Sequence, residues 1–278
     1  MRTIVGYRRT IVALDLLGIG CIPAVIAAIH FLVPVGLQEQ FIFRQSLNRP
    51  ETFLTAAYLH LTDQHLFGNL LGYALAAVYT YVLCLYAGER QWFWLTTLAF
   101  LTLLPVAVNL TSMAIWQTAY AGVNIPASRG LSGVVAGYGG FLVVALLVLL
   151  RKEYQGWAVS YVGQFVLLVV LGELLVIYAD SPPIIGGALL LLAIGLVGVG
   201  MVVDVYPDGL PEDREGWLSI LLAGLLVILV VVVVSVLVYG LFPVQLVEDG
   251  SLTNIFAHMS GLVWGAVIAG WGYRYWGK

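Results

Sequence analysis

The sequence predicts an all-α protein that crosses a lipid bilayer several times, and three observations support this. Of its 278 residues, 61% are hydrophobic and only 10% are charged. The mean hydropathy is +0.99. Apolar runs of 20 residues or more recur along the chain, and a helix of about 20 residues spans a hydrocarbon core of about 30 Å.

Charge and cysteine content argue against several other classes. The formal net charge is -3 and the basic residues are scattered, so the sequence indicates no nucleic-acid partner. Cys21 and Cys84 both lie in apolar runs, which leaves no disulfide framework and no cysteine metal site. No soluble domain, low-complexity tail or internal repeat interrupts the pattern. We therefore expect residues 1–278 to form a single transmembrane domain.

Eight apolar runs account for the expected helices. The first follows a basic start and is longer than a signal-peptide core of about 7 to 15 residues, so we expect a retained helix. Asp15 within it is expected to pair with Arg8 and Arg9 at the membrane interface. The polar loop 34–55 is expected to contain short interfacial helix. The runs lie at 11–33, 58–86, 91–115, 131–150, 157–178, 184–203, 217–241 and 254–273.

The basic residues set the expected orientation. With a cytoplasmic N-terminus, eight crossings place nine lysines and arginines inside and only three, Arg44, Arg49 and Arg129, outside. This is the excess that the positive-inside rule describes. We therefore expect a multi-pass protein of a cell membrane, of the prokaryotic plasma-membrane type, with both termini cytoplasmic. The helices beginning near Tyr58, Leu131 and Asn254 then all start on the outer side.

A glycine-rich segment, 128–140, opens the fourth run. Ser132 lies between Gly130 and Gly133, where a helix is expected to begin. The unpaired N–H groups and partial positive charge of a helix N-terminus favour a developing oxyanion, as an acyl-transfer nucleophile requires. Small residues in membrane helices also serve close helix packing, and that interpretation of the same motif stays open.

Three of the four histidines lie at the outer starts of these helices. His65 and Asn69 are four residues apart and so about 40° apart around a helix. His258 shares a face with Gly261 and Gly265, which lets its helix approach another backbone closely. A serine nucleophile needs a base within about 2.6–3.2 Å, and His258 is the candidate. Each histidine alone also fits interhelical hydrogen bonding, and a zinc site is disfavoured because it needs three or four ligands.

In these motifs the chain resembles the rhomboid family of intramembrane serine proteases. The three family signatures occur in order as HLFGN at 65–69, GLSG at 130–133 and AHMSG at 257–261, with Gly265 one turn further on. His60 matches another histidine common in that family. The resemblance covers the first four runs and the last. It implies a rhomboid-like helical bundle with about eight transmembrane helices, a six-helix core plus an extra pair.

The resemblance also implies roles for individual residues. The catalytic dyad would be Ser132 and His258, with no acidic third member and with no metal or other cofactor. The oxyanion would be held by His65, Asn69 and the Ser132 backbone N–H. The supporting positions that the resemblance implies are His60, Gly130, Gly133, Gly261 and Gly265.

The implied activity is that of a serine endopeptidase that cleaves transmembrane segments of membrane proteins near their extracytoplasmic end. Its partners would be transmembrane protein substrates and the lipid bilayer, and the sequence indicates no oligomeric state. The alternative is a proteolytically inactive rhomboid-like protein with a binding or quality-control role. Relatives of that kind usually lack the serine or the histidine, whereas both are present here.

The chain departs from the family pattern in three places. Three apolar runs, rather than one, separate the serine and histidine helices, and because three is odd the last helix keeps its direction. A Trp-Arg pair frequent in the first outer loop is absent, and Ala136 stands where an aromatic residue often follows the serine. We expect the valine-rich run 217–241 and the loop 242–253 to form a lateral gate beside a peripheral hairpin at 157–203. A run that only faces lipid would have the same composition.

Overall fold

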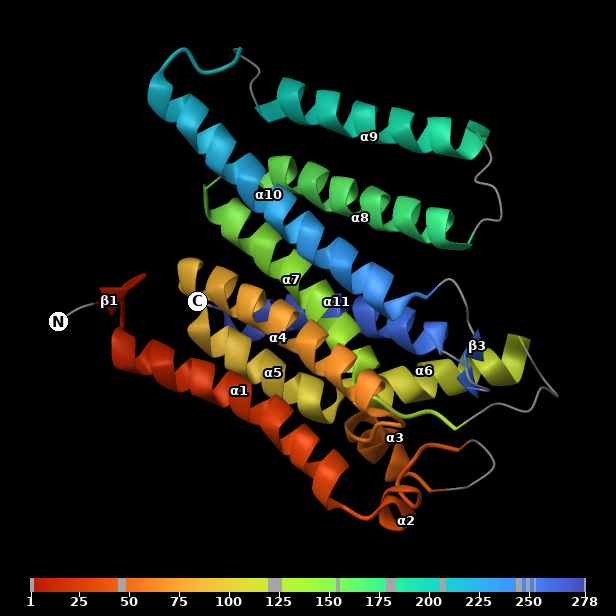
Figure 1. Cartoon of the computed structure of the whole chain (residues 1–278). Coiled ribbons are helices and arrows are strands. Elements are labelled where there is room, and N and C mark those ends of the chain that lie inside the picture. Colours follow the sequence, from red (N-terminus) through yellow and green to blue (C-terminus); the bar gives the residue numbers. More distant parts are fainter. Residues whose placement is uncertain are drawn as a thin grey trace. The chain divides into compact units, whose positions relative to one another are not determined.

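The structure is a computed structural model of the chain (Figure 1). It describes residues 3–44, 49–119, 127–153, 156–178, 184–205, 209–243, 247–248, 251–252 and 254–277. Helices dominate these residues, and the strands are confined to two short antiparallel hairpins. The chain divides into two units, one of Met1–Leu142 with Gln245–Lys278 and the other of Val143–Val244.

The first unit carries every candidate site residue. Its N-terminal hairpin joins β1 (Thr3–Ile4) to β2 (Tyr7–Arg8) and leads into α1 (Arg9–Leu32). The polar loop that follows contains α2 (Val35–Gln38), α3 (Thr52–Thr55) and the 3-10 turn η1 (Ala56–Tyr58), so the short helix expected there is present. The other elements of this unit are α4 (Asp63–Tyr86), α5 (Arg90–Thr102), α6 (Leu104–Ala119), α7 (Ser132–Glu153) as far as Leu142, β3 (Val247–Glu248), β4 (Ser251–Leu252) and α11 (Ile255–Trp276).

The second unit contains the rest of α7 with α8 (Gly156–Tyr178), α9 (Ile184–Val205) and α10 (Arg214–Leu241). Helix α8 packs against α9, where the Tyr161 hydroxyl donates to Asp204, and also against α10. Gln245, Asp249 and Gly250, which belong to the expected gate loop, lie outside the described residues. The gate stays a prediction.

The helices confirm a multi-pass, all-α membrane protein. Among the described residues, six helices are long and apolar enough to cross a membrane, namely α1, α4, α7, α8, α10 and α11. The bent pair of α5 and α6 provides a seventh candidate. Helix α9 covers the remaining expected run, but its apolar stretch Leu190–Asp204 falls short of the same test.

Two expected helix boundaries were wrong. The sequence predicts one helix over 91–115, but α5 ends at Thr102 and α6 begins at Leu104 with a bend of 46°. Pro105 accounts for the break, since proline lacks an N–H and disfavours a helical residue before it. Helix α4 begins at Asp63 rather than near Tyr58, because the Thr62 hydroxyl accepts from a backbone N–H of its first turn.

Asp15 pairs with a different arginine from those expected. Its carboxylate accepts two hydrogen bonds of 2.6 Å from the guanidinium of Arg90, at the start of α5, rather than pairing with Arg8 or Arg9. The Tyr81 hydroxyl and the Trp94 indole N–H donate to the same carboxylate at 2.6 and 3.0 Å. A buried carboxylate is tolerated only when its charge and lone pairs are satisfied. This network ties α1, α4 and α5 together.

Helices α7 and α11 meet at backbone-to-backbone distance. A Cβ atom added to Gly261 would lie 2.2 Å from the Gly133 carbonyl oxygen, and one added to Gly265 would lie 2.2 Å from that of Gly137. Neither glycine position admits a side chain without moving a helix. The close approach predicted for the face shared by His258, Gly261 and Gly265 is therefore present.

This contact predicts the effect of one added methyl group. Gly265→Ala should destabilise the folded protein by about 1–3 kcal/mol, the usual range for overpacking a tight site. Gly270→Ala on the same helix is the control, because Gly270 is exposed and has no neighbour within 4 Å of an added Cβ. Both changes alter helix propensity equally, so thermal unfolding in detergent should separate them by the packing term alone. Equal stabilities would contradict the contact.

Candidate active site

Ser132 and His258 form a hydrogen-bonded pair. The Nε2 atom of His258 lies 2.8 Å from the Ser132 hydroxyl oxygen, within the distance at which a base activates a nucleophile. Ser132 is the first residue of α7, and His258 lies in the first turn of α11. The pair therefore stands where two helix N-termini meet.

Polar contacts fix the start of α11. The Asn254 side-chain oxygen caps the helix by accepting from the Ala257 N–H at 3.2 Å, a preferred use of asparagine at a helix N-terminus. The Asn254 amide nitrogen also donates to the Ser112 hydroxyl on α6 at 2.7 Å. His258, which is only 7% exposed, is thus held at a defined height relative to α6.

Gly130 is required by the backbone just before Ser132. Its φ angle is +124°, a region that residues with a side chain rarely adopt. A Cβ atom at Gly130 would also lie 2.6 Å from Cε1 of His65. Glycine is thus needed here for its conformation and for the space that His65 occupies.

His65 and Asn69 both lie beside this glycine, as their shared helix face predicts. The Nδ2 atom of Asn69 would be 3.4 Å from a Cβ at Gly130, which places it beside the backbone that leads to Ser132. Asn69 is 5% exposed, and its Nδ2 atom has no hydrogen-bond partner among the described residues. An unpaired buried donor costs about 1–3 kcal/mol, so the Asn69 amide is open to a polar partner beside the Ser132 segment.

His60 contacts the other side of the same segment. It precedes α4, and its Nε2 atom accepts from the Leu131 N–H at 3.4 Å. Burial, with smaller contributions from His65 and His30, lowers the pKa of His60 to about 3. His60 is therefore neutral at physiological pH and can act as an acceptor, with its proton on Nδ1. It supports the backbone next to Ser132.

His30 is a further member of this histidine group that no sequence motif indicated. Its Nε2 atom lies 2.9 Å from a carboxylate oxygen of Asp63, and its ring centroid is 6.4 Å from that of His60. Its position near the end of the first apolar run could have indicated this contact, because the end of one membrane helix lies close to the start of the next. His30 therefore links α1 to the residues that support the serine segment.

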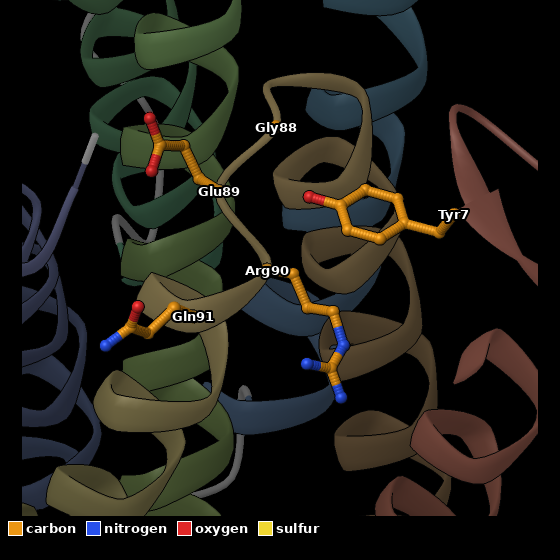
Figure 2. A pocket seen from close by; sticks show the side chains of 5 residues that line it. All are labelled: Tyr7, Gly88, Glu89, Arg90 and Gln91. Atoms are coloured by element: carbon orange, nitrogen blue, oxygen red, sulfur yellow. The ribbon is translucent and has the colours of Figure 1, made fainter.

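No metal centre appears in the described part of the chain. Groups of three or more histidine, cysteine, aspartate or glutamate side chains placed to hold a metal are absent from it. A cavity of about 190 Å³ is lined by Tyr7, Gly88, Glu89, Arg90 and Gln91 (Figure 2). These residues lie at the far end of α4 from His65, about 30 Å away along a helix that rises 1.5 Å per residue. The cavity contains none of the predicted site residues.

Comparisons with protein-family models, curated proteins and solved structures found no match to this chain. A functional assignment therefore depends on the residues themselves and on their geometry. In the first unit, that geometry brings together residues from three separated stretches of sequence. Gly130 lies just before α7 and Ser132 at its start, His65 and Asn69 lie on α4, and His258 lies on α11.

Proposed function

We propose that this protein is a rhomboid-type intramembrane serine endopeptidase that uses Ser132 and His258 as its catalytic dyad. The observation that carries the proposal is the 2.8 Å separation of His258 Nε2 and the Ser132 hydroxyl oxygen. Beside it stand a buried, unpaired amide donor and a glycine conformation that a side chain would disrupt. Helix packing alone would not require the hydrogen-bonded pair.

The proposed reaction begins with proton transfer within the dyad. His258 Nε2 takes the proton from the Ser132 hydroxyl as its oxygen bonds to the carbonyl carbon of a peptide. The tetrahedral intermediate collapses when its C–N bond breaks, and His258 returns the proton to the leaving amine. Water, activated by the same histidine, then attacks the acyl-serine and releases the new carboxyl group. The dyad thus ends in its starting protonation state.

Asn69, His65 and the Ser132 backbone N–H would hold the oxyanion. The Asn69 Nδ2 atom is buried without a partner, so its hydrogen bond is available to a charge that develops only during reaction. A donor that is already oriented in a site of low dielectric pays no reorganisation cost when that charge forms. The unsatisfied amide in the resting structure would become satisfied in the transition state.

The proposed substrates are membrane proteins cut near the extracytoplasmic end of a transmembrane segment. The dyad lies at the ends of two apolar helices, α7 and α11, rather than at their centres. Within the proposed rhomboid-like bundle of about eight helices, α1, α4, the α5 and α6 pair, α7 and α11 account for five of six core positions. Helices α8 to α10 would supply the sixth and the added pair.

Removing either member of the dyad should abolish cleavage. Ser132→Ala and His258→Ala should each eliminate turnover of a model transmembrane substrate, because neither residue acts without the other. The double variant should be no worse than either single one, since groups that act as a unit are not additive. The measurement is cleavage in proteoliposomes, with thermal unfolding as the check on folding. Activity that survives Ser132→Ala but is lost on adding a chelator would show that a metal site, and not the dyad, cleaves the substrate.

Asn69→Ala should separate catalysis from stability. We expect kcat to fall by about 10- to 1,000-fold with little change in KM, because the amide is needed chiefly in the transition state. Stability should not fall, since the change removes a buried donor that has no partner. Asn109→Ala is the control, because the Asn109 amide already donates to the Phe53 carbonyl at 2.8 Å and its loss should lower stability. A KM effect alone for Asn69→Ala would refute its proposed role.

The proposed orientation puts both termini in the cytoplasm and Arg129 outside. Single cysteines placed at Arg129 and Arg151, in a chain whose two native cysteines are replaced, should react with impermeant reagents from opposite sides. This follows from the helix that separates them, α7, and from the distribution of basic residues. Labelling of both positions from the same side would overturn the orientation.

A further inference from the structure

The segment immediately before Ser132 is held along its length by the loop between α1 and α4. Phe43 and Ser128 exchange two backbone hydrogen bonds, of 3.1 and 2.9 Å. The Gly130 N–H donates to the Ala56 carbonyl at 3.0 Å, and the next N–H is taken by His60. We call residues 127–131 the approach segment. The backbone of this segment therefore sets the position of the Ser132 side chain.

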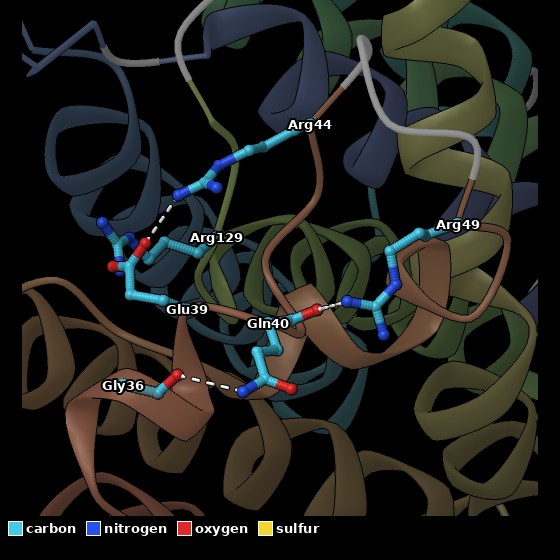
Figure 3. Close-up of polar contacts among 6 residues, drawn as sticks. All are labelled: Gly36, Glu39, Gln40, Arg44, Arg49 and Arg129. Atoms are coloured by element: carbon cyan, nitrogen blue, oxygen red, sulfur yellow. Dashed lines mark hydrogen bonds and ion pairs between the residues drawn. The ribbon is translucent and has the colours of Figure 1, made fainter.

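A further group of side-chain contacts to this segment centres on Glu39. One carboxylate oxygen of Glu39 accepts from the Arg129 guanidinium at 2.8 Å, and the other accepts from that of Arg44 at 2.6 Å. Figure 3 shows both arginines converging on this carboxylate. Arg129 belongs to the approach segment, whereas Arg44 belongs to the same loop as Glu39.

The two arginines differ in their surroundings. The Arg129 side chain is 18% exposed, against 42% for that of Arg44. Water screens exposed ion pairs strongly and buried ones less. Glu39 itself is fixed at the end of α2, where its N–H donates to the Val35 carbonyl at 2.9 Å. The less exposed pair is therefore the one that reaches from an ordered turn to the approach segment.

The approach segment needs such an attachment because of Gly130. Glycine has more conformational freedom than any other residue, and Gly130 holds a φ of +124° only two residues before Ser132. Backbone hydrogen bonds hold Ser128 and Gly130, the neighbours of Arg129. The Arg129 side chain adds a link from this segment to Glu39 at the end of α2. A displacement of about 1 Å at a reacting atom can cost about 100-fold in rate.

We propose that Glu39 is a positioning residue that acts through Arg129 to hold the Ser132 hydroxyl at its distance from His258. This inference rests on the proposed protease function. The Glu39 carboxylate takes no part in proton transfer. It restrains the approach segment through Arg129, whereas Arg44 only donates a hydrogen bond to the second carboxylate oxygen.

The two arginines provide a matched pair of variants. Arg129→Gln and Arg44→Gln each remove one guanidinium from the same carboxylate, yet only the first releases the approach segment. Arg129→Lys keeps a donor that can still reach Glu39. Glu51→Gln is a further control, because Glu51 pairs at 2.8 Å with Arg49 within the same loop and contacts no residue of the approach segment through that pair.

The readouts are kcat and KM for a transmembrane substrate and hydrogen exchange at the amides of residues 128–131. Glu39→Gln and Arg129→Gln should lower kcat by about 10- to 100-fold, leave KM within about threefold, and speed exchange. Arg129→Lys should recover most of kcat, within about fivefold of wild type, since one charged hydrogen bond remains. Arg44→Gln and Glu51→Gln should stay within about twofold of wild type in kcat, because surface ion pairs contribute little.

The inference is overturned if Arg129→Gln and Arg44→Gln change kcat and exchange alike, or if Glu39→Gln changes neither. These outcomes are distinct from failure of the protease proposal, which would appear as a wild-type protein that cleaves nothing or as full activity in Ser132→Ala. In that case the exchange data alone decide whether Glu39 orders the approach segment. A gain in exchange confined to Glu39→Gln and Arg129→Gln would still support the positioning role.

Discussion

The glycine contact between α7 and α11 is the constraint on which the proposed site depends. Because Gly261 and Gly265 lie against the carbonyls of Gly133 and Gly137, the two backbones approach as closely as atoms allow, and the helices cannot slide past one another. Ser132 comes one residue before the first of these contacts, and His258 three residues before Gly261. A side chain at either contact would separate the helices, and Ser132 would move away from His258.

The Asp15 carboxylate and the Asn69 amide differ in how their hydrogen bonds are satisfied. At one end, the Asp15 carboxylate satisfies donors from Arg90, Tyr81 and Trp94, so its charge is fully compensated and its helices are fixed. At the other end, the Asn69 amide is buried without a partner. Proteins usually satisfy buried polar groups, so the unpaired Asn69 amide fits the oxyanion role proposed for it.

Much of the fold could be predicted from the sequence because membrane helices need long apolar runs, and each such run became a helix or a bent pair. The approach of His258 to a neighbouring backbone was also predictable, since Gly261 and Gly265 recur on its face. The partner of Asp15 was not, because Arg90 is distant in sequence and adjacent only after α1 packs on α4. Likewise, Glu39 and Arg129 are both ordinary loop residues whose pairing depends on the three-dimensional path of two loops. The break at Pro105 could have been foreseen from proline chemistry alone.

The most direct test of the account asks which atom of the protein is nucleophilic. Purified protein in detergent would be treated with a fluorophosphonate probe, digested, and its covalent adduct located by mass spectrometry. We predict phosphonylation at Ser132, greatly slowed by His258→Ala and absent in Ser132→Ala, with no dependence on metal ions. An adduct on a different serine, or equal labelling of wild type and His258→Ala, would contradict the claim that His258 activates Ser132.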